Sequence, residues 1–251
     1  MLEKKIALAG YRVLSGLRSN ITIPVQQTRS TIYTPGINEA STDSNPTFAN
    51  VTLSPVKFVG STLVGKEMLV NSNDDVVAFI SDSIITEIAL KLEAYMLGKV
   101  ATGAANTVTY SSIDAVTYDD ILTMEGYLGQ YNLEAINFVM ASGTRAALKG
   151  IAKIGNYPSF LIEDNFCNGY EARVSGAISD SNIYFGSWDK LVLGTWSGLE
   201  LIVDPFTNAK SGAVQIVGSL CADAAVVQPD AFVIGKVQES SSSSGQEWLT
   251  E

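Results

Sequence analysis

The chain has 251 residues, a formal net charge of −10, 46% hydrophobic residues and no histidine. An acidic body repels nucleic-acid phosphates, which argues against nucleic-acid binding as the main activity. Without histidine the chain has no Ser-His-Asp or Cys-His triad and no His-ligated metal site. Its two cysteines, Cys167 and Cys221, cannot form a disulfide scaffold or a four-thiolate zinc site, and we expect both to be buried free thiols.

The N-terminal segment is basic, unlike the rest of the chain. Residues 1–29 contain five Lys or Arg residues and one Glu, a net of +4, so the remaining residues carry −14. Such an arm would be attracted to the acidic body of another copy; a solvated basic helix face is the alternative. No apolar run reaches the roughly 18 residues that span a bilayer, so we expect no membrane partner. The candidate contact residues of the arm are Lys4, Lys5, Arg12 and Arg18.

Beyond the arm, β-branched and aromatic residues predict short strands at 21–25, 30–34 and 48–53. Residues 35–46, between the last two, are rich in turn formers. The third strand continues through 56–64, so we predict a long two-stranded hairpin with a polar tip. Two such strands are barely stable alone, and we expect a neighbouring subunit to support them. The candidate contact residues at the tip are Pro35, Gly36, Asn38, Glu39, Asn45, Pro46 and Thr47.

Apolar residues at helical spacing predict a helix over residues 74–97, about 35 Å long. The expected C-cap of this helix is Gly98. A second helix should begin at Thr117 and end near Gly129. The remaining predicted elements are a buried strand at 137–140, a short helix at 143–149, and strands at 183–185, 191–193, 199–203, 214–217 and 224–227.

Three kinds of motif could carry chemistry, but each has a structural explanation. Residues 60–66 match part of a phosphate-binding loop, yet Glu67 stands where the magnesium-binding hydroxyl should be, and a strand with a glycine bend is the alternative. The acidic pairs at 74–75 and 119–120 fit helix N-termini, and Glu163-Asp164 fits a solvated loop. No nucleophile–base pair or metal cluster is visible, so we expect a non-enzymatic chain with no cofactor. Three aromatic residues of the later strands are expected in the core: Phe185, Trp188 and Trp196.

Several segments share their order and spacing with one known family. They are Asn20-Ile-Thr-Ile-Pro24, a stretch ending in Glu39, Asn45 to Pro55, Lys66-Glu-Met-Leu69, Ile183 to Asp189 and Val226 to Phe232. In this order the chain resembles the major capsid proteins of tailed bacteriophages (Hong Kong 97 type) over residues 6–236.

The resemblance implies an α+β fold, the phage major capsid fold, with an N-terminal arm, an extended β-hairpin loop, a long spine helix, a peripheral domain and an axial domain. The implied segments are 1–30 (arm), 31–65 (hairpin loop), 66–116 (spine helix and peripheral domain), 117–208 (axial domain), 209–236 (closing peripheral strands) and 237–251 (mobile tail).

The resemblance also implies a structural protein whose copies form hexamers and pentamers of an icosahedral head. The head encloses double-stranded DNA without sequence-specific contacts. The implied location is the virion, and the host cytoplasm during assembly. The implied partners are other copies of the chain, a scaffolding protein, a portal and a maturation protease. An encapsulin-like nanocompartment shell that holds cargo enzymes is the alternative.

Two departures from the family pattern lead to further expectations. Many precursors carry a long N-terminal scaffolding region, whereas this sequence begins almost at the arm, so we expect either a separate scaffolding protein or a processed chain. Some members also link subunits through an isopeptide bond from a loop lysine. The hairpin tip contains no lysine, and Lys57 lies on the returning strand, so we expect no covalent cross-links.

Overall fold

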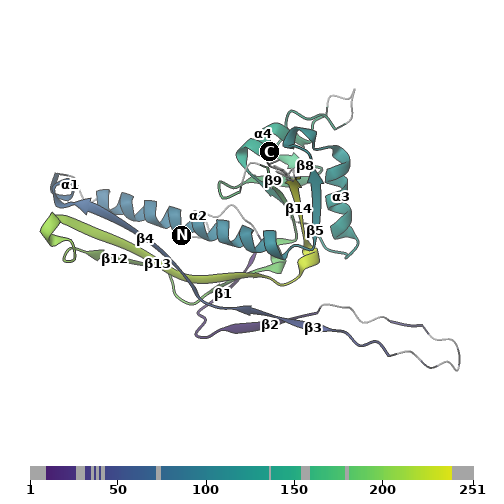
Figure 1. Ribbon diagram of the computed structural model, residues 1–251, viewed down its shortest axis with the longest axis horizontal. Helices are drawn as coiled ribbons and strands as arrows, with labels where there is room; N and C mark the ends of the chain where they lie inside the picture. Colours follow the sequence, from purple (N-terminus) through teal and green to yellow (C-terminus); the bar gives the residue numbers. More distant parts are fainter. Residues whose placement is uncertain are drawn as a thin grey trace, which may run out of the picture.

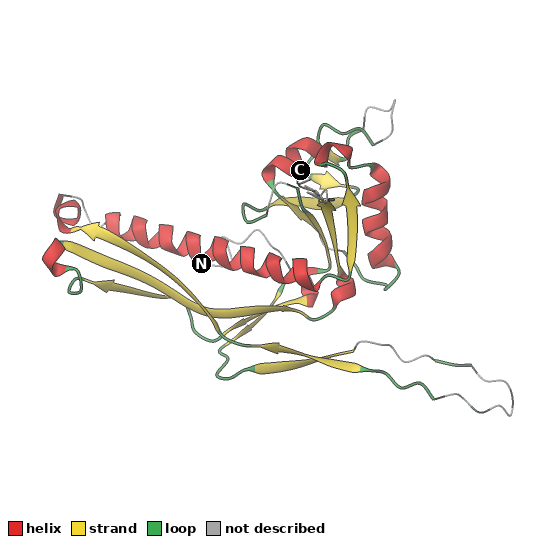
Figure 2. Ribbon diagram, viewed as in Figure 1, coloured by secondary structure: helices red, strands yellow, loops and turns green. Residues whose placement is uncertain are grey.

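The computed structural model describes residues 10–26, 32–34, 37, 40, 43–71, 75–135, 137–153, 159–178 and 181–238. Within this part of the chain the molecule has three regions (Figures 1 and 2). A long sheet lies under a long helix, a compact unit stands at one end of them, and a two-stranded hairpin extends below the compact unit.

The long sheet has five strands, and its central strand pairs with three of the others. The order is β1, β11, β13, β12, and β4 pairs with the opposite edge of β13. The first pair, β1 with β11, is parallel and the rest are antiparallel. The strands are β1 (Arg12–Ser15), β4 (Val56–Gly65), β11 (Leu191–Thr195), β12 (Glu200–Asp204) and β13 (Ala213–Val226).

Helix α2 (Asp75–Gly103) covers one face of the long sheet, and the short helix α1 (Lys66–Asn71) leads into it from β4. The predicted helix is confirmed, but its predicted end at Gly98 is wrong. The helix continues to Gly103 because apolar burial continues: Val100 is fully buried. The other apolar residues of α2 in this core include Ile84, Ile88, Leu92, Met96 and Leu97.

Strand β13 is a single strand of 14 residues, so the prediction of two separate strands at 214–217 and 224–227 was wrong. Gly218 interrupts the apolar run between them. A Cβ atom at Gly218 would lie 2.6 Å from Cγ2 of Ile84 on α2. The glycine therefore permits the close approach of the helix and does not end the strand.

The compact unit contains a seven-stranded sheet, with α3 (Tyr118–Gly129) and α4 (Ser142–Leu148) packed around it. Helix α3 begins as predicted: Thr117 and Asp120 form a reciprocal capping box. In the core the rings of Phe138 and Phe185 stack with their centroids 4.0 Å apart. The strand order is β5 (Asn106–Tyr110), β14 (Phe232–Val237), β10 (Ile183–Gly186), β6 (Asn137–Met140), β9 (Tyr170–Val174), β8 (Phe166–Cys167) and β7 (Ile162–Glu163).

The hairpin consists of β2 (Ile21–Gln26) and β3 (Phe48–Leu53), paired antiparallel with Ile21 opposite Leu53. The strand predicted at 21–25 is confirmed, but the predicted pairing of 30–34 with 48–53 was wrong, since residues 32–34 are not in a strand. The predicted continuation of the hairpin through 56–64 was also wrong. Strand β4 pairs with β13 instead, because its apolar residues Phe58 and Val64 are buried there beneath α2.

The two large sheets divide the chain differently from the predicted segments. Strands β11 and β12 lie within 117–208, yet both pair with β13 in the long sheet. Strand β14 lies within 209–236, yet it pairs with β5 and β10 in the compact unit. Its last residue is Val237, the first residue of the predicted tail, and residues 239–251 lie outside the described residues. Long-range strand pairing, which local patterns do not encode, causes these differences.

The predicted core residues are mostly where we expected them. Phe185, Trp188 and Cys167 are fully buried, and burial raises the pKa of the Cys167 thiol to about 12. Trp196 is only half-buried, although it packs against the small core at the base of the hairpin. Cys221 is also half-buried, so the expectation of a fully buried thiol was wrong for this residue. It lies on the side of β13 that faces away from α2.

Candidate inter-subunit surfaces

The hairpin presents apolar side chains to solvent. Phe48, the first residue of β3, is 67% exposed. Ile32 and Ile37, beyond the ends of the two strands, are 89% and 97% exposed. Large apolar side chains gathered on one projecting element are typical of an interaction surface.

The predicted contact residues of the tip are only partly described. Asn45 and Thr47 are exposed and Pro46 is half-buried, all in the segment that leads into β3. The other four predicted tip residues lie outside the described residues: Pro35, Gly36, Asn38 and Glu39.

A cavity of about 670 Å³ separates the hairpin from the body of the molecule. The hairpin lines it with apolar side chains, Val25, Ala49 and Val51, and the body lines it with Tyr131 and residues 226–230. The hairpin therefore does not pack tightly against the compact unit along this stretch. Its attachment lies at its root, where Leu53 of β3 packs with Val192 and Ala225 of the long sheet.

The second half of the predicted basic arm is part of the body of the molecule. Arg12 begins β1, which pairs with β11, and its side chain is exposed. Arg18 is exposed in the segment between β1 and β2. The other two predicted arm contacts, Lys4 and Lys5, lie outside the described residues. Both described arginines are thus available to another molecule.

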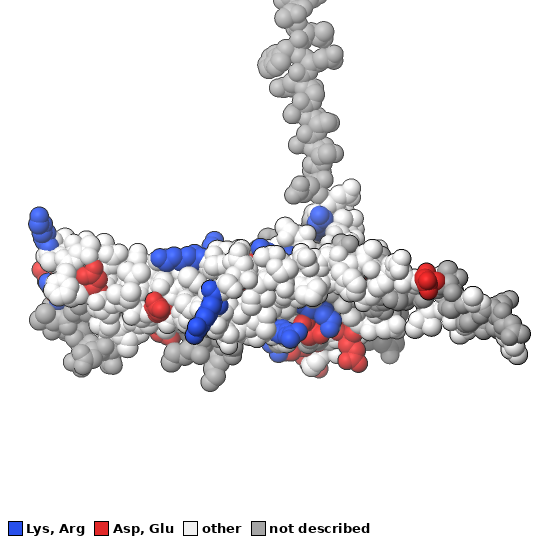
Figure 3. Space-filling model, turned by 90° about the horizontal axis from the view of Figure 1, so that it is seen from below, with Lys and Arg blue, Asp and Glu red and all other residues white. Residues whose placement is uncertain are grey.

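The long sheet has one open face, on the side away from α2. Alternation along β4 places Phe58 and Val64 under the helix and turns Val59 and Leu63 to the other side, where they are 53% and 61% exposed. Ile202 of β12 lies on this side too and is 56% exposed. We call Val59, Leu63 and Ile202 the open sheet face. Seen from below, this side of the molecule consists mainly of uncharged residues (Figure 3).

The phosphate-loop match at 60–66 forms no such loop. Residues 60–65 are part of β4 and pair in register with β13, from Gly60 opposite Gly218 to Gly65 opposite Ala213. The next residue, Lys66, begins α1, and its backbone N–H donates to the carbonyl of Gly212. Backbone N–H groups held in a strand ladder cannot converge on a phosphate. The nucleotide-binding hypothesis is therefore wrong, and the strand alternative is confirmed.

The acidic pairs have structural roles where they are described. Asp120 caps α3, as predicted. Glu163 lies at the end of β7 and accepts a hydrogen bond from the backbone N–H of Phe160, which lowers the pKa of this exposed carboxyl. Asp164 and Asn165 have positive φ angles in the tight turn to β8. Among the described residues, no group of three or more His, Cys, Asp or Glu is arranged to hold a metal ion.

The sequence was compared with those of known protein families. The phage capsid family matches residues 3–237 of the sequence. This chain belongs to the phage capsid family. Membership of this family confirms the resemblance and the prediction of a structural protein rather than an enzyme.

Among curated relatives, the phage capsid chain is similar to the major capsid protein of Halomonas phage phiHAP-1. The two are 24% identical over 212 residues, which cover 80% of this chain and 35% of the relative. The chain therefore spans about a third of that relative's length. In the described part of the chain, no helix is both long enough and apolar enough to cross a bilayer.

Solved structures share the fold of this phage capsid chain. A structure titled "Capsid of native GTA particle computed with C5 symmetry" has a TM-score of 0.72 at 18% identity, covering 91% of this chain and 88% of that one. Structures from Microbacterium phage Oxtober96 and Gordonia phage Cozz have TM-scores of 0.70 and 0.67 at 14% and 17% identity. They cover 92% and 94% of this chain and 90% and 86% of theirs. The predicted α+β capsid fold is confirmed.

Two features of these surfaces were missed from the sequence. The open sheet face was missed because β4 was assigned to the hairpin. The alternation of side chains along β4 could therefore not be related to the two faces of the long sheet. Asp223, a buried carboxylate at the root of the hairpin, was also missed. Its signal was present: a single charged residue stands within the apolar segment Ala222–Val227.

Proposed function

We propose that this phage capsid chain is the major capsid subunit of a tailed-phage head, located in the virion. The observation that carries the proposal is the hairpin, which projects from the body with apolar side chains exposed and has little core of its own. A two-stranded element of this kind gains stability when it lies on another surface. Family membership supports the same conclusion.

The receiving surface is the open sheet face of a second copy. In Figure 1 the hairpin and the long sheet extend in opposite directions from the hairpin root, so a chain cannot lay its hairpin on its own open face. The hairpin of one copy would cover Val59, Leu63 and Ile202 of the next. Such a head-to-tail contact closes into a ring when the rotation between copies fits a whole turn. This contact supports assembly into hexamers and pentamers.

The remaining partners follow from this role. A head of this kind is filled with double-stranded DNA through a portal, and its assembly uses a scaffolding protein and a maturation protease in the host cytoplasm. The net charge of −10 disfavours adhesion of the shell to the DNA, and we propose no sequence-specific contacts.

Deletion of residues 36–45 tests the proposal. We expect the variant to fold, because no described core residue is removed, and to form no closed shells when imaged by negative-stain electron microscopy. A matched control removes ten residues, 240–249, from the C-terminal segment and should still assemble. Normal shells from the hairpin variant would contradict the role of the hairpin.

The contents of purified shells test the enclosed partner. Nuclease-resistant DNA inside shells isolated from the phage host would support the head. Shells that enclose an enzyme and no DNA would instead support the encapsulin-like alternative.

A further inference from the structure

The root of the hairpin is held at both of its strands. On the β2 side, the indole N–H of Trp196 donates to the carbonyl of Ser19 at 2.9 Å. On the β3 side, Leu53 is fully buried, and Ser54 forms the corner where the chain turns from β3 into β4. A Cβ atom at Gly194 would lie 3.0 Å from Leu17 and 3.4 Å from Leu53, so the two sides approach closely there. The direction in which the hairpin leaves the body is therefore determined by a few residues at its root.

Asp223 holds the corner on the β3 side. Asp223 is only 3% exposed, and its carboxylate accepts hydrogen bonds from several elements. Oδ2 accepts from the backbone N–H of Ser54 at 2.9 Å. Oδ1 accepts from the Tyr95 hydroxyl at 2.8 Å and from the backbone N–H of Ala224 at 2.8 Å. The Lys99 ammonium lies 3.6 Å from Oδ1.

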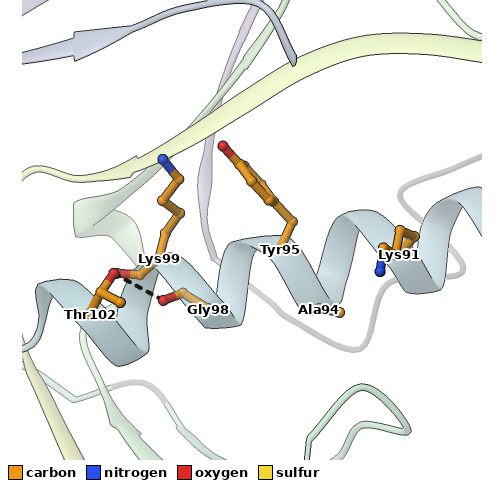
Figure 4. A pocket seen from close by; sticks show the side chains of 6 residues that line it. All are labelled: Lys91, Ala94, Tyr95, Gly98, Lys99 and Thr102. Carbon is orange, nitrogen blue, oxygen red and sulfur yellow. Dashed lines mark hydrogen bonds between the residues drawn. The ribbon is translucent and has the colours of Figure 1, made fainter. Parts of the chain in front are cut away.

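Two of these partners come from the long helix. Tyr95 and Lys99 lie one turn apart on α2, and both side chains extend from the helix toward β13 (Figure 4). The ammonium of Lys99 lies over the Tyr95 ring at 5.1 Å, and the Phe58 ring packs edge-on against Tyr95 at 5.4 Å. Burial, followed by the hydrogen bond to Asp223, raises the pKa of the Tyr95 hydroxyl, so this hydroxyl stays protonated and donates.

A buried carboxylate is costly unless its donors are in place. Here the donors belong to the hairpin corner, to β13 itself and to α2. All of them can reach the carboxylate only when these three elements keep the relative positions that they have in this structure. A purely apolar contact would tolerate sliding or rotation of the hairpin, whereas hydrogen bonds restrict distance and angle. Because the buried carboxylate of Asp223 must keep its hydrogen-bond donors, it restricts the relative positions of the hairpin corner, β13 and α2.

We propose that Asp223 is a positioning residue for assembly: it fixes the direction in which the hairpin leaves the body and couples that direction to α2 through Tyr95 and Lys99. The inference rests on the proposed function, in which the hairpin reaches a second copy. An error of direction at the root grows along the hairpin, so a loosened root misplaces the tip on the neighbour. A shift of α2 relative to the sheet would likewise redirect the hairpin.

The test measures hairpin direction and assembly in the same variants of the full chain. Tyr95→Phe removes one hydroxyl from the cluster, and Asp223→Asn replaces an acceptor oxygen with an amide that faces N–H donors. The matched control is Tyr118→Phe in the compact unit, where the lost hydroxyl donates to Oδ1 of Asn168 at 3.0 Å. Spin labels on p-acetylphenylalanine at positions 50 and 87, exposed on β3 and α2, report the distance between hairpin and helix in the unassembled subunit.

We expect both cluster variants to broaden this distance distribution and to lower the yield of closed shells, while the control changes neither. The melting temperature of each variant shows whether the body is intact; if Asp223→Asn fails to fold, Tyr95→Phe decides. An unchanged distance distribution and shell yield in a folded cluster variant would overturn the inference and leave the proposed function standing. Shells formed without the hairpin tip would instead overturn the proposed function.

Discussion

Single residues decide how closely the long helix and the long sheet approach. Gly218 leaves room for Ile84 and Ile88 of α2, and Asp223, five residues further along β13, bonds to the next turns of the same helix. One strand thus offers a glycine beside Ile84 and Ile88 and a carboxylate beside Tyr95. The two contacts act together to set the position of α2.

We expect Gly218→Ala to lower the free energy of unfolding by about 1–3 kcal/mol, the usual cost of overpacking a core. The new methyl group would lie 2.6 Å from Cγ2 of Ile84, a β-branched side chain with little freedom to turn away. The matched control is Gly65→Ala in β4, where a Cβ atom meets nothing within 4 Å. Urea unfolding of the unassembled subunit measures both, and equal effects would contradict a close approach at Gly218.

At the level of elements, local patterns could be predicted and strand partners could not. The existence of the long helix, predicted over 74–97 and observed over 75–103, follows from apolar spacing, and the start of the helix at 118–129 follows from Thr117 and Asp120. The partner of β3 was misassigned because residues 21–26 and 30–34 are similar in composition, and only the fold selects one. The end of α2 was misplaced because Gly98 is a local stop signal, whereas burial of Val100 depends on the sheet.

The arm gives a prediction at the same scale. Neutralising its four predicted contacts, Lys4, Lys5, Arg12 and Arg18, to Gln should slow assembly at low salt, because the arm would lose its attraction to an acidic neighbour. Salt shortens the range of such attraction from about 10 Å at 0.1 M to about 3 Å at 1 M. We therefore expect light scattering to show slower assembly of the variant than of the wild-type chain at low salt, with a difference that narrows as salt is raised. Equal salt dependence in both would contradict the role of the arm.

For the whole molecule, the family and fold could be predicted from the sequence, but the surfaces that join copies were only partly predicted. The contact role of the hairpin could be predicted because two strands without a core of their own are barely stable unless they pack on another surface. The open sheet face required knowledge of which side of β4 the helix covers, and the root cluster required three distant segments to meet at Asp223. Both depend on contacts between residues far apart in the chain, which no short pattern records.

The assembled shell should be held together without covalent bonds. An isopeptide link would need a lysine placed against an asparagine of the neighbour, and residues 21–53, which include the hairpin and its tip, contain no lysine. Lys57 is the first lysine after them, and pairing of β4 with β13 keeps it on the body, opposite Cys221. Boiled shells on a denaturing gel should therefore run as monomers. A ladder of higher bands would contradict this expectation, and its loss in Lys57→Arg would identify the lysine and place the open side of β4 at the interface.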